Sequence, residues 1–213
     1  MKASIFDLDG VIVNTVPFHF KAWQRMFKEY GKDFTFDDYK KKVDGIPRIS
    51  GAKAILDDLS GDELEKAGDK KQGYFLEYLK SEKIQVYNTT IDLIKDFKEK
   101  GIKIAVISSS KNCLPILKRV NLVDIFDVII TGNDTTKGKP DPQVFFMAAE
   151  KLHVEPETCV VFEDAVLGVE AAKRAGMKCV GIDRYEKPER LSKAELVVSD
   201  LGKVNIETIK ALF

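Results

Sequence analysis

The sequence contains few cysteines and no long apolar stretch. Three cysteines (Cys113, Cys159 and Cys179) occur among 213 residues. Their odd number and spacing argue against both a disulfide framework and a structural zinc site. No apolar run approaches the roughly 20 residues that span a membrane. The N-terminus also lacks the charged-then-apolar pattern of a secretory signal. We therefore expect a cytoplasmic protein with reduced thiols and no membrane partner.

The sequence also lacks an excess of charge of either sign, an internal repeat and any low-complexity segment. Its 34 Lys and Arg residues balance 34 Asp and Glu residues, so no basic surface indicates a nucleic-acid partner. Hydrophobic residues make up 44% of the chain and charged residues 32%, which is typical of a folded globular protein. The length is sufficient for one domain and a sizeable insertion.

Short apolar runs alternate with helical patterns from residue 84 onward. Such continuous apolar strands, separated by helices, are typical of an α/β fold with a parallel sheet covered on both faces. For the helix over 142–152, we expect Asp141 as the N-cap and Pro142 as the first residue. Strands are predicted at 3–6, 103–107, 127–131, 159–162, 178–182 and 196–198, and helices at 90–100, 112–120, 142–152, 165–175 and 204–212.

Residues 14–83 have a different pattern. They contain helical stretches at 18–30 and 62–79 and no strand signal. Because this segment follows the first strand directly, we interpret it as a helical domain inserted into the sheet domain. The predicted domains are therefore a core of residues 1–13 and 84–213 and an insertion of residues 14–83, with hinges near 14–16 and 81–84.

Polar residues follow the predicted strands at the edge where open parallel sheets bind ligands. Carboxylate oxygens there suit Mg²⁺, and hydroxyl, backbone N–H and lysine groups suit a phosphate. One carboxylate can attack phosphorus and a second can move the proton. Each feature alone is common in loops and helix caps, but their order along the chain indicates phosphoryl transfer. The residues are Asp7, Asp9, Ser108, Ser109, Ser110, Lys111, Asn112, Lys139, Glu163 and Asp164.

With the motifs DLDGVIVNT (7–15), Ser108 after KIAVI, GKPDP (138–142) and FEDA (162–165), the sequence resembles the haloacid dehalogenase superfamily. This resemblance implies a Rossmann-like core with an inserted α-helical cap, Mg²⁺ as cofactor, and a small sugar phosphate as substrate. It implies Asp7 as nucleophile and Asp9 as general acid/base. Ser108, Ser109 and Lys139 would hold the phosphoryl group, and the metal ligands would be Asp7, Asp9 and Asp164 with Glu163 or water.

Within that superfamily, FHFKAW, DGIPR and SSSKN resemble the β-phosphoglucomutase-like subfamily. The resemblance implies that His19 lies near the acid/base and that Arg48 binds a second phosphate. The alternatives are that His19 only packs on Trp23 and that Arg48 is a solvated loop residue. The implied substrate and cap residues are His19, Trp23, Gly45, Arg48, Lys71 or its neighbour Lys70, Ser110, Lys111 and Asn112.

The sequence departs from the subfamily pattern at Ala165, where many members have serine, at VYNTT (86–90), and after Arg48, where no acidic residue follows. Three functions therefore stay open for what we expect to be a monomer. The first is a β-phosphoglucomutase that converts β-glucose 1-phosphate to glucose 6-phosphate through a bisphosphate. The second is a sugar-phosphate phosphatase, and the third is an inactive phosphosugar-binding protein.

Overall fold

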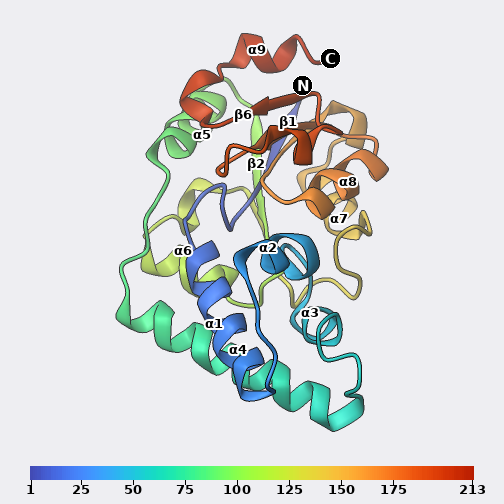
Figure 1. Cartoon of the computed structure of the whole chain (residues 1–213). Helices are drawn as coiled ribbons and strands as arrows, with labels where there is room; N and C mark the ends of the chain where they lie inside the picture. The colour runs from blue at the N-terminus through green and yellow to red at the C-terminus, as the bar shows by residue number, and fades with distance from the viewer.

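In the computed structural model, which describes residues 1–213, a six-stranded parallel sheet forms the centre of the core (Figure 1). The strand order is β3-β2-β1-β4-β5-β6. The predicted α/β fold with a Rossmann-like parallel sheet is therefore confirmed. The strands are β1 (Ala3–Asp7), β2 (Lys103–Ile107), β3 (Val128–Ile130), β4 (Cys159–Glu163), β5 (Lys178–Ile182) and β6 (Leu196–Val198).

Helices cover both faces of the sheet because side chains alternate between its two faces along each strand. Phe6, Val106 and Phe162 share one apolar cluster with α5 (Asn88–Glu99), α6 (Cys113–Arg119) and α9 (Ile206–Lys210). Ile5 and Val161 face the opposite side, in a cluster with α7 (Gln143–Leu152) and α8 (Val166–Arg174). No helix in the structure combines the length and apolar character needed to cross a membrane.

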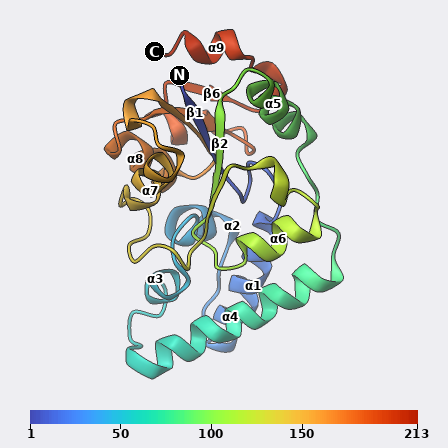
Figure 2. The ribbon, with the colours of Figure 1, turned by 180° about the vertical axis from the view of Figure 1, so that it is seen from behind.

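Helices are the main elements of the segment between β1 and α5, and they lie beyond the carboxyl ends of the strands (Figures 1 and 2). Its helices have an apolar cluster of their own, which includes Trp23, Phe27, Leu56 and Leu64. They occupy the region that the sequence assigns to the cap (residues 14–83). The elements are α1 (Val16–Glu29), α2 (Phe36–Asp38), the π-helical turn η1 (Tyr39–Val43), α3 (Arg48–Lys53) and α4 (Gly61–Ser81).

The two chain segments that join this cap to the core run side by side. The Asn14 N–H donates to the Gln85 carbonyl over 2.9 Å, and the Tyr87 N–H donates to the Ile12 carbonyl over 2.9 Å. An antiparallel bridge between Val13 and Val86 lies between these bonds. The cap therefore leaves and re-enters the core at one place.

Several predicted helix ends differ from the structure by one or two residues. The helix expected over 90–100 spans Asn88–Glu99, and the helix expected over 204–212 spans Ile206–Lys210. The start of the last helix is set by Asn205, whose side chain caps it by accepting the Thr208 N–H over 2.9 Å. The expected helix over 142–152 begins at Gln143 instead, with Pro142 in the N-cap position. Asp141 still serves this helix end, since its Oδ1 accepts the Gln143 N–H over 3.0 Å.

The aromatic pair Phe6 and Phe162 gives a test of the sheet core. Their stacked rings have centroids 4.4 Å apart, and Phe162 is fully buried, whereas Phe146 is 45% exposed. F162A should lower the free energy of unfolding by about 3–5 kcal/mol, because it leaves a cavity between two strands. The matched variant F146A should change it by less than about 0.5 kcal/mol. Urea unfolding measures both, and equal losses would contradict the core assignment.

Candidate active site

Asp7 lies where β1 ends in the middle of the sheet, between β2 and β4. Its side chain is almost fully buried, at 9% exposure. Oδ2 accepts the Asp9 N–H over 2.9 Å, and Oδ1 accepts from Lys139 Nζ over 2.6 Å. Burial raises the pKa of Asp7 to about 7, although Lys139 opposes this and the charges of Asp9 and Asp164 add to it.

Lys139 is the cation of this buried site. Its ammonium pairs with Asp7 and also with Glu163 Oε1. Burial alone would lower the pKa of Lys139, but the two carboxylates raise it well above its ordinary value. The Ala165 N–H donates to the other Glu163 oxygen over 2.8 Å. Glu163 also needs a glycine beside it, because a Cβ at Gly168 would lie 1.8 Å from its Oε1.

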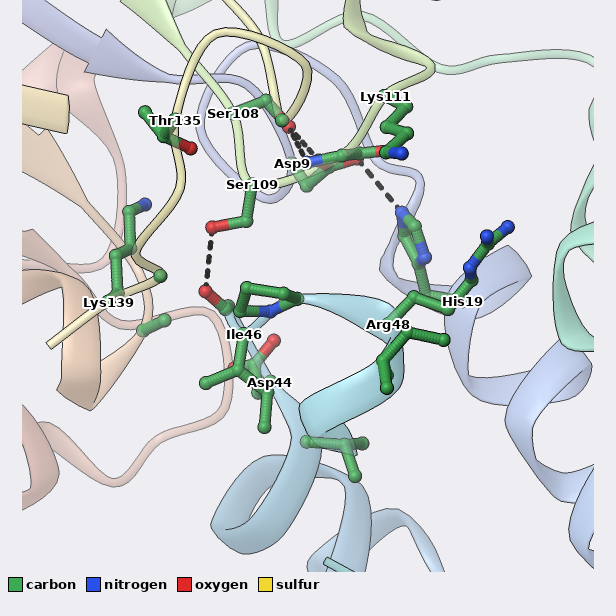
Figure 3. Close-up of a pocket in the computed structure, with 18 of the residues that line it drawn as sticks. Asp9, His19, Asp44, Ile46, Arg48, Ser108, Ser109, Lys111, Thr135 and Lys139 are labelled. Carbon is green, nitrogen blue, oxygen red and sulfur yellow. Dashed lines mark hydrogen bonds and ion pairs between the residues drawn. The ribbon is translucent and has the colours of Figure 1, made fainter. Parts of the chain in front are cut away.

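Asp9 lies in a different environment from Asp7. The Thr15 hydroxyl donates to its Oδ1, and the Ser108 hydroxyl donates to its Oδ2 over 3.1 Å. His19 Nε2 lies 3.4 Å from Oδ1 (Figure 3). Burial would raise the pKa of Asp9, but the hydrogen bonds from His19, Thr15 and Ser108 outweigh it and lower that pKa. The two aspartates therefore differ in proton affinity although they are two residues apart.

His19 and Lys71 connect Asp9 to the cap. Lys71 Nζ lies 2.9 Å from His19 Nδ1, and the His19 ring stacks on Phe75 at 4.1 Å. An ammonium at Lys71 donates to Nδ1, which leaves the proton of a neutral His19 on Nε2, facing Asp9. Burial lowers the pKa of Lys71 to about 7. Lys71 is therefore the lysine that faces the site, whereas Lys70 pairs with Glu29 on the surface.

The serine-rich loop after β2 lies between the core and the cap. Ser108 Oγ accepts the Ser110 N–H over 3.0 Å, and Ser110 Oγ accepts the Asn112 N–H over 3.1 Å. Ser109 reaches across the cleft, because its hydroxyl donates to the Gly45 carbonyl over 2.8 Å (Figure 3). Asn112 and Gln72 exchange two amide hydrogen bonds of 2.8 and 3.2 Å. This loop therefore carries two contacts with the cap.

Arg48 faces the same cavity from the cap loop that begins at Gly45. Its guanidinium pairs with Asp69 at 3.1 Å and is partly exposed. Trp23 is buried in the cap core, stacked on Phe27 at 5.2 Å, with Lys71 Nζ 5.0 Å from its ring. The tryptophan therefore supports the cap and borders the ammonium of Lys71.

A cavity of about 280 Å³ lies between the cap and the core. It brings together side chains from the ends of β1, β2 and β4 and from the cap, and Lys111 lies at its rim (Figure 3). Sequence reasoning did not name Thr15, Lys40, Asp44 or Gln72 as site residues, although all four contact the site or its neighbours. Thr15 and Asp44 had a signal, since they stand in the DLDGVIVNT and DGIPR motifs, whereas Lys40 and Gln72 had none.

The four predicted metal ligands do not form a preassembled metal cluster in this arrangement. Their chemistry nevertheless fits a hard divalent cation, because all are carboxylates at the ends of β1 and β4. Burial raises the pKa of Asp164, with the charges of Asp44 and Glu163 adding to it and Lys40 opposing it. The charge of Asp164 also raises the pKa of Asp7. A cation between these two carboxylates would relieve their repulsion.

Comparisons with known proteins agree with this site. A family model described as haloacid dehalogenase-like hydrolase matches residues 4–182. A phosphorylated carbohydrates phosphatase of Thermotoga maritima is 37% identical over 84% of this chain and 83% of its own length. A beta-phosphoglucomutase of Bacillus subtilis is 34% identical over 98% of this chain and 94% of its own. The crystal structure of a beta-phosphoglucomutase from Clostridium difficile has a TM-score of 0.89 at 31% identity, covering 100% of this chain and 96% of the other.

The Rossmann-like sheet, the helical cap and the carboxylate–lysine site define an enzyme of the phosphoryl-transfer class. The chain belongs to the haloacid dehalogenase-like hydrolase family, among β-phosphoglucomutase-like members. These comparisons confirm the resemblance that the motifs indicated, whereas the role of each site residue stays a prediction.

The buried carboxyl of Asp7 predicts a pH dependence of stability. Its folded pKa of about 7 lies above the ordinary 3.8, so the folded state binds this proton more tightly than the unfolded state. Without metal, the wild-type free energy of unfolding should fall as pH rises from about 4 to about 7, by at most about 4 kcal/mol from this group.

D7N should make that fall shallower and not abolish it, because burial also raises the pKa of Glu163 and of Asp164 to about 7. The exposed-site variant D92N should keep the wild-type slope. Urea unfolding at pH 4, 5, 6 and 7 in EDTA measures the slope for all three proteins. The same slope in D7N and wild type would show that Asp7 does not titrate as its burial requires.

Proposed function

We propose that the protein is a Mg²⁺-dependent β-phosphoglucomutase that works through an aspartyl-phosphate on Asp7. The observation that carries this proposal is the contrast between Asp7 and Asp9. Asp7 is paired with Lys139 and faces the cavity, as a nucleophile toward phosphorus requires. Asp9 accepts hydrogen bonds from Thr15 and Ser108 and lies 3.4 Å from His19 Nε2, as a positioned proton carrier requires.

The chemistry follows from these positions. A carboxylate oxygen of Asp7 forms a bond to phosphorus while the bond from phosphorus to the sugar oxygen breaks. Ionised Asp9, which its lowered pKa favours, takes the proton of a hydroxyl that accepts the phosphoryl group from Asp7. The Asp9 carboxyl protonated in that step then gives the proton to the sugar oxygen that leaves phosphorus in the next step. The ammonium of Lys139 lies where charge develops on the phosphoryl oxygens.

Mg²⁺, held by Asp7, Asp9, Glu163 and Asp164, would supply further positive charge to the phosphoryl group. Lys139, Ser108 and Ser109 would hold the same group from the protein side. The contacts of Glu163 with Lys139 and the Ala165 N–H support a second role for this residue, which is to orient the lysine.

The cap would bind the second phosphate group of the bisphosphate intermediate. Arg48 offers a planar fork for two phosphate oxygens. Ser110 and Lys111 line the same cavity from the core loop, and Asn112 follows them and pairs with Gln72 of the cap. We propose that residues 14–83 move as a unit on the paired linkers, so that the intermediate can turn over between half-reactions while water is excluded.

A phosphatase of small sugar phosphates is the second candidate, and specific contacts favour it. Arg48 is already paired with Asp69, and Asn112 with Gln72, so groups of the second phosphate site are engaged by the protein itself. The Thermotoga maritima relative also bears a phosphatase name. An inactive binding protein is disfavoured because Asp7, Asp9 and Lys139 are all present and in contact.

One assay separates these functions. The protein is incubated with β-glucose 1-phosphate, Mg²⁺ and a trace of glucose 1,6-bisphosphate, and glucose 6-phosphate and free phosphate are followed together. We expect glucose 6-phosphate to form faster than phosphate, because the sugar hydroxyl outcompetes water for the aspartyl-phosphate. D7N should lose at least about a thousandfold in turnover, because no nucleophile remains.

Formation of free phosphate without glucose 6-phosphate would contradict the proposed mutase and support a phosphatase. If neither wild type nor D7N turned over any phosphomonoester, the inactive phosphosugar-binding protein would be the one candidate function that fits.

Arg48 gives a second test of the mutase. R48A should reduce glucose 6-phosphate formation roughly ten- to a hundredfold, because one charge-assisted phosphate contact is lost. Hydrolysis of a small phosphomonoester with no second phosphate should stay unchanged. R25A is the matched control, because Arg25 lies on the cap surface and pairs with Glu77. Equal loss of both activities in R48A would mean that Arg48 supports the cap and not a second phosphate.

A further inference from the structure

Lys40 is the buried member of the lysine run Lys40–Lys41–Lys42 in the π-helical turn η1 of the cap. Its side chain is 6% exposed, whereas those of Lys41 and Lys42 are 69% and 49% exposed. Lys41 pairs with Asp37 and Lys42 with Asp38 on the cap surface. One ammonium of three is therefore directed inward, away from water.

The Lys40 ammonium joins the cap to the metal-binding end of β4. It lies 3.4 Å from Asp164 Oδ2 and also pairs with Asp44 of the cap. The Tyr185 ring of the core lies beneath it, with 4.6 Å between the ammonium and the ring centroid. Asp164 and Asp44 are 3% and 8% exposed. Both ion pairs are therefore buried, where water screens them little.

Asp164 has little freedom to turn away from Lys40. Its carboxylate packs against the backbone of Gly10, where a Cβ would lie 2.4 Å from Oδ2. Gly10 also has φ of +84°, which glycine adopts without strain. The carboxylate is thus enclosed by the loop after β1 on one side and by a cap lysine on the other.

We propose that Lys40 is a cation carried by the cap that competes with Mg²⁺ for the charge of Asp164. This inference rests on the proposed Mg²⁺ site at that residue. Two cations on one buried carboxylate repel each other, so the ammonium weakens metal binding while the cap is closed. Thermodynamic reciprocity then requires that Mg²⁺ weaken the closed position of the substrate-free cap to the same degree.

K40M tests this proposal in the full-length protein. Titration calorimetry with Mg²⁺ should show at least about tenfold tighter binding than in wild type, because a buried positive charge is removed beside the metal. Mg²⁺ should also raise the melting temperature of K40M more than that of wild type. K41M removes the same charge from the exposed neighbour and should bind Mg²⁺ as wild type does.

D44N should shift the affinity in the opposite direction. It removes the second carboxylate that shares Lys40, so the ammonium stays on Asp164 and Mg²⁺ binding weakens.

If K40M does not fold, K40Q carries the same test with a neutral polar side chain. Unchanged or weaker Mg²⁺ binding in the folded Lys40 variant overturns the competition. If wild type itself binds no Mg²⁺, the metal site of the proposed function fails, and this inference fails with it.

Discussion

The buried contact of one lysine with two carboxylates is the interaction on which the site depends. Asp7 and Glu163 end adjacent strands, so the parallel sheet itself brings their charges together. Removing one partner of a buried ion pair leaves an uncompensated charge, which costs several kcal/mol. Lys139 compensates both carboxylate charges, and it lies on a third chain segment, the loop between β3 and α7. The ammonium of Lys139 therefore holds the ends of β1 and β4 and its own loop together, and Asp7 faces the cavity.

Much of the core could be predicted because its signals are local. Each apolar run ends in a polar residue, and the direction of a parallel sheet places Asp7, Ser108 and Glu163 at one edge. The roles of Lys40 and Gln72 could not be predicted, because a lysine in a run of three gives no sign of which one is buried. That choice depends on how the cap packs against β4, which is a tertiary property. The start of the last helix was predicted too early because Asn205, an ordinary residue within a helical pattern, caps it.

The division of labour between core and cap explains why mutase and phosphatase are hard to separate by sequence. In the mechanism proposed above, the core supplies the nucleophile, the proton carrier and the lysine, and these would serve transfer to a sugar and to water equally well. The cap would supply what differs, namely a contact from Arg48 to a second phosphate and the exclusion of water. The contacts of Arg48 are compatible with a mutase and with a phosphatase. Arg48 is present for a second phosphate, but it is already paired with Asp69. Whether a sugar or water accepts the phosphoryl group would therefore depend on which of these contacts the substrate replaces when the cap closes.

The central position of β1 also has a consequence for how the chain is made. Ala3 pairs with Lys103 on one side and with Cys159 on the other. During synthesis, this apolar strand is translated before either neighbour and has no strand to pair with until β2 has been translated. The helical segment between them, rich in contacts close in sequence, can fold during that interval, whereas contacts distant in sequence form slowly. The nascent chain can therefore fold the helices between β1 and α5 before the sheet next to them is complete.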